Sequence, residues 1–163
     1  IQNIILRITN VFKKLPEYSY EIVFTDNRST DQTFSKIESF SKNFKNIKAV
    51  RFSRNFGYQK SIYSGYLLAN GDAVIQIDGD LQDPPELIPE FLNFWKSGYK
   101  IVYGIRKKRM EGFMITFMRK VFYRMINWLS EDELPLDAGD FRLVDREVID
   151  KAMKYSLTSS PYI

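Results

Sequence analysis

The chain has 163 residues, 44% hydrophobic and 27% charged, a composition typical of one globular domain that excludes a disordered chain. It contains neither cysteine nor histidine, which excludes disulfides, thiolate nucleophiles and the usual cysteine or histidine sites for transition metals. Any chemistry must therefore use carboxylates, hydroxyls and amides, and such oxygen ligands favour Mg²⁺ or Mn²⁺.

Apolar residues at helical spacing predict that the chain begins on a helix, from about Ile4 to Leu15. A buried strand is predicted next, followed by a helix that a capping box of Ser29 and Gln32 opens. The strand spans residues 20–25, and the helix after it carries Phe34, Ile37, Phe40 and Phe44. The later predicted elements are strand 48–52, helix 58–69, strand 73–78, a helix to about 96, strand 100–103, an amphipathic segment 112–129, a loop and a final helix at about 145–154.

The regular alternation of strands and helices predicts an α/β fold with three layers, in which helices cover both faces of a mostly parallel central sheet. No internal repeat or interdomain linker interrupts residues 1–163, so one domain is expected. Ligands of such folds bind beyond the carboxyl ends of the strands, which directs attention to the residues that follow each predicted strand.

The third predicted strand ends in Asp78-Gly79-Asp80-Leu81-Gln82. Two carboxylates one residue apart at a strand end can share a divalent cation that also binds a diphosphate. Gly79 lets the backbone turn and the ligand approach, and Gln82 offers another oxygen. An Asp-x-Asp in a polar turn is the alternative, but Asp78 closes an apolar run, where an uncompensated carboxylate is costly. For Asp83 we favour the plain interpretation, a helix cap before Pro84.

Three further loops contain candidate residues of weaker signal. Asp26 and Asn27 follow the first predicted strand, where Asp26 could contact a nucleobase or ribose, or simply form a turn. Arg54 follows the second strand, and spacing alone does not separate a phosphate ligand from an ordinary loop residue. Asp137 and Asp140 form an acidic pair in a loop beside an arginine, which usually indicates a surface ion pair.

A basic region lies between residues 106 and 124, with seven basic residues and one acidic residue. Such a region attracts phosphate groups on nucleotides, nucleic acids or anionic lipids. The amphipathic segment that overlaps it is equally consistent with a helix on the domain core and with an interfacial helix that lies on a membrane across 106–129.

Taken together, these motifs resemble the family-2 glycosyltransferases of GT-A fold, and among them the polyprenyl-phosphate branch. The matching segments occur in family order and cover about residues 20–154. They are EIVFTDNRSTD, SRNFGYQKS, GDAVIQIDGDLQDPPELIP, GYKIVYGIRKKR, FYRMIN and LDAGDFRLVDREV.

The resemblance implies an inverting transfer of sugar from a UDP- or GDP-linked donor to a polyprenyl phosphate. Asp26 would then contact the nucleobase, with Asn27 and Arg54 at the nucleotide. Asp78, Asp80 and Gln82 would hold Mg²⁺ or Mn²⁺ on the diphosphate beside Gly79. Arg106 would contact a phosphate of the acceptor or of the leaving group. Asp140, with Asp137 nearby, would lie on the acceptor side as the candidate base.

The chain departs from the family pattern in three places. Asn27-Arg28 stands where the family often has Asp-Gly, which bears on the nucleobase pocket. The family's first strand and the membrane helices of the bacterial branch lack counterparts, so we expect a fragment of a larger protein. That protein would be anchored at the cytoplasmic side of the membrane, with this part peripheral. A homo-oligomer is also compatible with the sequence.

Two rival interpretations remain. A sugar nucleotidyltransferase would also be an α/β protein with an aspartate-held metal, but it should carry a Gly-rich phosphate loop after its first strand. A non-catalytic domain that binds nucleotide, or nucleic acid through the basic region, is the other. The strand-end carboxylates would repel a nucleic-acid backbone, so we do not expect nucleic acid as a partner.

Overall fold

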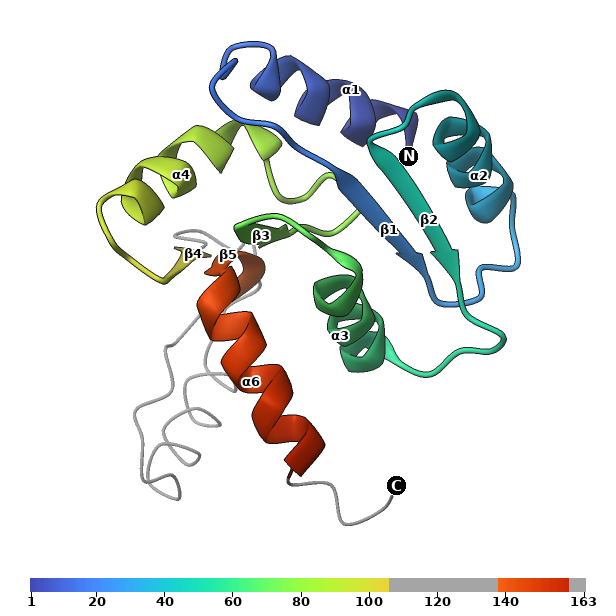
Figure 1. Cartoon of the computed structure of the whole chain (residues 1–163). Helices are drawn as coiled ribbons and strands as arrows, with labels where there is room; N and C mark the ends of the chain where they lie inside the picture. The colour runs from blue at the N-terminus through green and yellow to red at the C-terminus, as the bar shows by residue number, and fades with distance from the viewer. Residues whose placement is uncertain (106–137, 159–163) are drawn as a thin grey trace, which may run out of the picture.

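The computed structural model describes residues 1–105 and 138–158. The predicted membrane-binding segment 106–129, Arg106 and Asp137 lie outside these ranges. Within the described ranges, no helix is both long and apolar enough to cross a bilayer. The elements are α1 (Gln2–Phe12), β1 (Ile22–Asp26), α2 (Thr33–Asn43), β2 (Ile47–Arg51), α3 (Tyr58–Leu68), β3 (Ala73–Gln76), the 3₁₀ helix η1 (Pro85–Leu87), α4 (Ile88–Lys96), β4 (Ile101–Ile105), β5 (Ala138–Asp145) and α6 (Arg146–Thr158) (Figure 1).

The described strands form two separate sheets. β1 pairs in parallel with β2, in a register that places Ile22 opposite Ile47. In the second sheet β5 lies between β3 and β4 and runs antiparallel to both. The sequence predicted a loop where β5 lies, and that prediction is wrong for residues 138–145.

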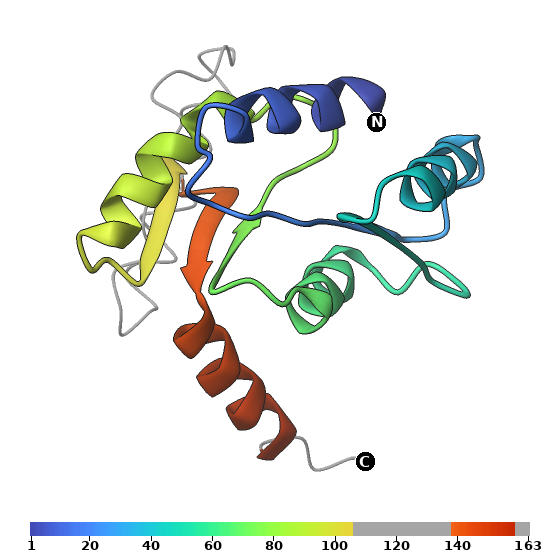
Figure 2. The same cartoon turned by 45° about the horizontal axis from the view of Figure 1, so that its top comes forward.

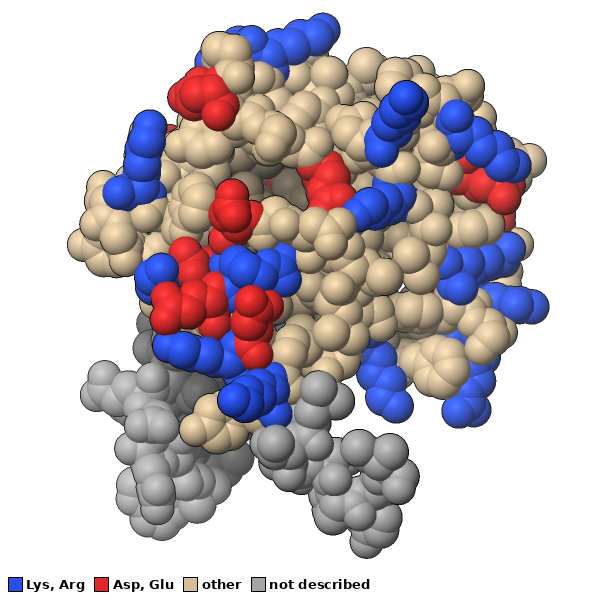
Figure 3. Space-filling model, in the orientation of Figure 1, with Lys and Arg blue, Asp and Glu red and all other residues tan. Residues whose placement is uncertain are grey.

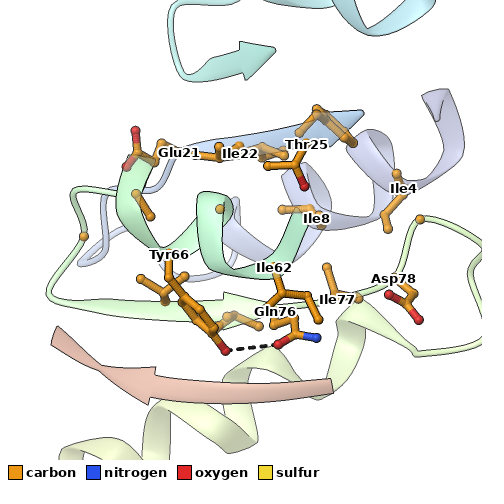
Figure 4. A pocket seen from close by; sticks show the side chains of 18 of the residues that line it. Ile4, Ile8, Glu21, Ile22, Thr25, Ile62, Tyr66, Gln76, Ile77 and Asp78 are labelled. Atoms are coloured by element: carbon orange, nitrogen blue, oxygen red, sulfur yellow. Dashed lines mark hydrogen bonds between the residues drawn. The ribbon is translucent and has the colours of Figure 1, made fainter. Parts of the chain in front are cut away.

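The predicted α/β architecture is confirmed, with one qualification on strand direction. β3 and β4 both oppose β5 and so run the same way, and β1 runs in the same sense as β3 (Figure 4). β1 to β4 thus run in the same direction, as expected for a mostly parallel arrangement, and β5 runs opposite to its neighbours β3 and β4. Figure 2 shows α1, α2 and α4 on one side of the strands and α3 and α6 on the other, which gives the expected three layers.

The apolar core lies between the second sheet and the two helices that cover it, α1 and α4. Leu143 in the central strand β5 is 0% exposed, and the ring of Phe141 from the same strand packs at a tilt against that of Phe91 of α4, with ring centroids 4.6 Å apart. Alternation along β5 places Phe141 and Leu143 on the same buried face. The buried cluster comprises Val11, Ile88, Phe91, Leu92, Phe141 and Leu143.

Two predicted helix starts are displaced. Pro84 precedes Pro85 and is held in an extended conformation (φ −81°, ψ 115°), because a residue before proline disfavours helical angles. The 3₁₀ turn therefore begins at Pro85, and Asp83 precedes the cap position, contrary to its predicted role. Similarly, α2 begins at Thr33 after Gln32 without a side-chain cap, so the predicted capping box is wrong.

Asp145 joins the second sheet to α6. Its Oδ1 accepts the backbone N–H of Glu147 at 3.0 Å, as an N-cap does, and its Oδ2 accepts the indole N–H of Trp95 at 2.7 Å. Lys100 Nζ lies 3.2 Å from Oδ2, among alternating acidic and basic side chains where β4, β5 and α6 meet (Figure 3). The Trp95 hydrogen bond, with those of Glu147 and Lys100, lowers the pKa of Asp145.

We expect Asp145→Ala to reduce the free energy of unfolding at neutral pH by about 1 kcal/mol through the lost cap alone. Because the folded-state pKa of Asp145 lies below the unfolded value of about 3.9, the stabilisation is present above that value. It is lost as pH falls through the folded-state pKa.

Urea unfolding across pH measures this difference. The control is Asp150→Ala, whose carboxylate is exposed and forms an (i, i+4) ion pair with Arg146 at 3.6 Å, and which should cost little. The cost of Asp145→Ala should shrink as the solution is acidified, and a cost that is constant with pH would contradict the assigned role.

Candidate functional site

A cavity of about 1000 Å³ lies between β1 and β3, with residues of α1 and α3 also in its wall (Figure 4). Its long sides are mainly apolar. Polar side chains gather where β1 and β3 reach their carboxyl ends, the position at which α/β folds bind ligands. The polar residues at this end are Asp26, Asn27, Asn55, Tyr58 and Asp78.

Asp78 is the central side chain of this end of the cavity. It follows β3 and is half-buried, and its Oδ1 accepts the hydroxyl of Tyr58, the first residue of α3, at 3.1 Å. Burial raises the pKa of Asp78, and the hydrogen bond from Tyr58 offsets part of that increase. Burial, together with the charges of Asp78 and Asp140, also raises the pKa of Tyr58.

Further carboxylates surround Asp78. The negative charges of Asp140, Asp80 and Asp83 all add to the increase in the pKa of Asp78. Asp83, predicted as a helix cap, is instead buried at 4% exposure close enough to act on Asp78. Repulsion among these groups is the charge arrangement that a cation relieves.

The turn between Asp80 and Gln82 is strained. Asp80 Oδ1 accepts the backbone N–H of Gln82 at 3.0 Å, and Leu81 between them has φ 68°, in the left-handed region that leucine rarely adopts. Strain of this kind is concentrated at ligand-binding turns. Both Asp80 and Gln82 are exposed and lie outside the lining of the cavity.

Asp26 ends β1 and organises the loop that follows it. The carboxylate is buried at 4% exposure, both of its oxygens lie 3.2 Å from the backbone N–H of Ser29, and Arg51 Nε lies 3.3 Å from Oδ2. Asp26 therefore shapes the polar end of the cavity through its own loop, and it also lines that cavity.

Asn27 joins the loop after β1 to the loop after β2. Its Nδ2 donates to Asn55 Oδ1 at 2.8 Å, and its Oδ1 accepts the N–H of Phe56 at 2.9 Å. A second aspartate at this position would lack the donor, so the amide suits the local contacts. Arg28, at φ 68°, donates to the Ser53 carbonyl at 3.1 Å and holds the same two loops together.

The structure gathers some of the predicted site residues and separates others. Asp26, Asn27, Asp78 and Gly79 line the same cavity. Asp140, predicted in a loop, lies in β5, where its Oδ1 is 3.4 Å from Arg142 and its charge acts on Asp78. Arg54 lies over the ring of Phe56, 4.7 Å from its centroid, outside the cavity lining.

The residues at this end of the cavity could supply part of the oxygen ligands of a divalent cation, with the rest coming from a bound substrate. Asp78 and Asp80 would offer carboxylate oxygens, the ligands that Mg²⁺ and Mn²⁺ prefer. Within residues 1–105 and 138–158, no three acidic side chains are arranged as a ready-made metal site. Mg²⁺ is commonly held by one or two carboxylates plus substrate phosphates, which matches this arrangement.

Sequence reasoning missed Tyr58 and Arg142. Tyr58 stood in a recognised motif directly after Gly57, but only the fold shows that α3 directs its hydroxyl to Asp78. Arg142 was interpreted as half of a surface ion pair, and it also donates to Gln76 Oε1 at 3.1 Å, which links β5 to β3. The side-chain alternation of β5 was the signal that could have revealed this link.

The sequence matches the model of the family described as Glycosyl transferase family 2 over residues 2–152. It is 39% identical over 158 residues to the uncharacterized glycosyltransferase YkcC of Bacillus subtilis, covering 96% of this chain and 48% of that protein. It is 37% identical over 140 residues to a bactoprenol glucosyl transferase of Shigella phage SfV, covering 85% and 46% respectively. The chain thus spans about half the length of the curated relatives it matches.

Two solved structures share the fold. One is titled as the crystal structure of a mycobacterial protein, with a TM-score of 0.55 at 18% identity over 87% of this chain and 49% of the other. The other is S. aureus TarS 1–349, with a TM-score of 0.54 at 17% identity over 90% of this chain and 45% of that one.

Proposed function

The chain belongs to glycosyl transferase family 2, and we propose that it forms the donor-binding part of an inverting enzyme that transfers a sugar from a nucleotide-diphosphate sugar to a polyprenyl phosphate. Support for the reaction class comes from family membership, and support for the acceptor comes from the bactoprenol glucosyl transferases at 37% identity. The observation that carries the proposal is the half-buried Asp78 among acidic neighbours at the polar end of the cavity.

The nucleotide would enter the polar end of the cavity. Asn27 and Asn55 would present amide groups there, and the buried Asp26 keeps the intervening loop in shape. The diphosphate would lie next to Asp78 and Asp80, which would hold Mg²⁺ or Mn²⁺. That cation, when bound, would neutralise the charge that develops on the leaving diphosphate.

The acceptor phosphate would attack the anomeric carbon from the side opposite the leaving nucleotide diphosphate. Because the second pKa of a phosphate monoester is about 6, the acceptor is largely ionised at neutral pH and needs little general-base help. Asp140, which lies near Asp78 and pairs with Arg142, would then act on the acceptor side chiefly through position and charge.

A polyprenyl acceptor lies in a bilayer, so we propose that the protein works at a membrane surface, on the cytoplasmic side where nucleotide sugars are made. The basic region 106–129 is the proposed contact with anionic lipid. Binding to vesicles of anionic lipid that weakens with added salt would support this contact.

The proposal is tested by thermal unfolding with UDP-, GDP- and dTDP-linked sugars, each with and without Mn²⁺. A ligand at 100 times its Kd should add about 2.7 kcal/mol of stability. We expect a clear rise in melting temperature for one nucleotide sugar with Mn²⁺, and little for the cation or the free sugar alone. An unchanged melting temperature with every donor at millimolar concentration would refute donor binding by this chain.

A further inference from the structure

We propose that a second pocket, between α3 and β5, binds the phosphate group of the polyprenyl acceptor. The pocket has a volume of about 430 Å³, which is in the range of small-molecule sites. None of the polar residues at the donor end of the larger cavity lines it. That the bound phosphate belongs to the acceptor rests on the proposed function. The described residues that line this pocket are Gln59, Lys60, Ile62, Tyr63, Tyr66 and Arg142.

The lining of this pocket is positively charged. Among the described residues it contains Lys60 and Arg142 and no carboxylate. Lys60 Nζ lies 5.8 Å from the centroid of the Phe56 ring and forms no ion pair within residues 1–105 and 138–158. A phosphate monoester carries about 1.5 to 2 negative charges at pH 7 and accepts several hydrogen bonds. It is therefore the ligand that complements an ammonium and a guanidinium group in one pocket.

Arg142 has donors to spare for such a ligand. Its Nε donates to Gln76 Oε1 at 3.1 Å, and its Nη2 lies 3.4 Å from Asp140 Oδ1. The second distance exceeds the roughly 2.7–2.9 Å of a strong charge-assisted hydrogen bond. A guanidinium group has more N–H donors than these two contacts use, and its planar shape suits a phosphate held through two oxygens.

Gln76 fixes the direction of the Arg142 side chain. Its Oε1 also accepts the hydroxyl of Tyr66 at 3.1 Å (Figure 4). The amide is thus oriented with its oxygen towards two donors, and Nε2 is buried without a hydrogen-bond partner among the described residues. An unpaired buried donor is costly, so this orientation of Gln76 is kept at the expense of stability. Its result is a guanidinium group that is positioned before any ligand binds.

Asp140 connects this pocket to the donor site. Asp140 and Arg142 lie two residues apart on β5 and so on the same face of the strand. Burial raises the pKa of Tyr66, the charge of Arg142 lowers it and that of Asp140 raises it. The charge of Asp140 also raises the pKa of Asp78. A phosphate bound at Arg142 would therefore lie beside the proposed diphosphate site and not in it, as transfer between two phosphorylated substrates requires.

The rest of the lining suits a lipid phosphate better than a free phosphate ion. Ile62 and the rings of Tyr63 and Tyr66 offer apolar surface next to the two cations. The first isoprene unit of the acceptor, which is joined directly to the phosphate, would contact this surface. The pocket thus combines the two chemical features of a polyprenyl phosphate.

The test measures binding of farnesyl phosphate, a short water-soluble polyprenyl monophosphate, without nucleotide sugar or divalent cation. We expect amide chemical shifts in NMR spectra to change at Lys60 to Tyr66 and at Arg142. Lys60→Gln should raise the Kd at least about fivefold, because it removes a charge-assisted contact. The matched control is Lys36→Gln, which makes the same charge change at an exposed position of α2 and should leave the Kd unchanged.

Asp140→Asn should have the opposite effect. It removes the carboxylate that competes with the phosphate for Arg142 and repels it, so we expect the Kd to fall about threefold or more. Asp72→Asn makes the same charge change at an exposed position before β3 and should alter the Kd little. Tighter binding by Asp140→Asn together with slower sugar transfer would separate the binding role of this pocket from the reaction itself.

Several results would overturn the proposal. Equal Kd values for the Lys60 and Lys36 variants would place the phosphate elsewhere, and equally tight binding of farnesol would show that phosphate is not recognised. Inorganic phosphate that binds as tightly as farnesyl phosphate would assign the pocket to the free ion and refute an acceptor site. Donor binding without these shifts would refute this pocket alone, whereas these shifts without donor binding would refute the donor site alone.

Discussion

Asp78→Asn should lower the rate of sugar transfer by at least about a hundredfold, because the substitution removes the charge that we propose holds a cation at the leaving diphosphate. The amide can still accept the hydroxyl of Tyr58, which lies 3.1 Å from Asp78 Oδ1, so the local structure should persist. Radiolabelled sugar transfer to a polyprenyl phosphate, in the protein that carries these residues, measures the loss.

The same substitution should leave stability unchanged or higher at neutral pH. Burial and the neighbouring carboxylates raise the pKa of Asp78. A raised pKa means that this group favours folding at pH values below its unfolded pKa, and that the contribution is lost as pH rises through the folded-state pKa. The neutral amide removes the charge that opposes folding at pH 7.

Asp72→Asn is the matched control, since Asp72 is an exposed aspartate at the opposite end of β3. It should change neither transfer nor donor binding. If Asp78→Asn destabilised the protein strongly, or if both variants lost transfer equally, the assignment of Asp78 to the donor diphosphate would be wrong.

Leu143→Ala should have the largest effect on stability, a loss of about 2–5 kcal/mol in the free energy of unfolding. Leu143 is 0% exposed in the middle strand of the second sheet, so truncation leaves a void among close-packed neighbours. The void would also loosen β5, the strand that supplies Asp140. Urea unfolding followed by circular dichroism measures the change.

Leu67→Ala provides the comparison, because Leu67 of α3 is 55% exposed. Its cost should stay within about 0.5 kcal/mol. Comparable losses in the two variants would show that the second sheet does not contain the core of the domain.

Much of the fold could be predicted because its elements are local patterns. Four strands and most helices fall within a few residues of their predicted positions, since apolar runs and glycine or proline breaks define them. β5 was missed because its first residues, Ala138-Gly139-Asp140, are poor strand formers and suggest a turn. The alternation of Phe141 and Leu143 is short, and its pairing partners lie far away in the sequence.

The residues of the candidate site likewise include some that the sequence could predict and others that it could not. Asp78 was found because a carboxylate that closes an apolar strand carries a desolvation cost visible in sequence. Asp83 was misassigned because the conformation that Pro85 imposes on Pro84 outweighed the capping pattern. Tyr58 was missed because its role depends on where α3 lies relative to β3, which no local pattern encodes. The assignments of Arg106 and Asp137 stay predictions.

The hydrogen bond between Tyr58 and Asp78 spans the two halves of the molecule, since α3 packs on β1 and Asp78 follows β3. The acceptor of this hydrogen bond is also an oxygen that the proposed cation would use. A ligand that occupies the Asp78 carboxylate must weaken this hydrogen bond. Because coupling between two interactions is reciprocal, a strong hydrogen bond must also lower the affinity for the ligand. Loss of the hydroxyl, as in Tyr58→Phe, should therefore tighten cation-dependent donor binding while it loosens the junction between the two sheets.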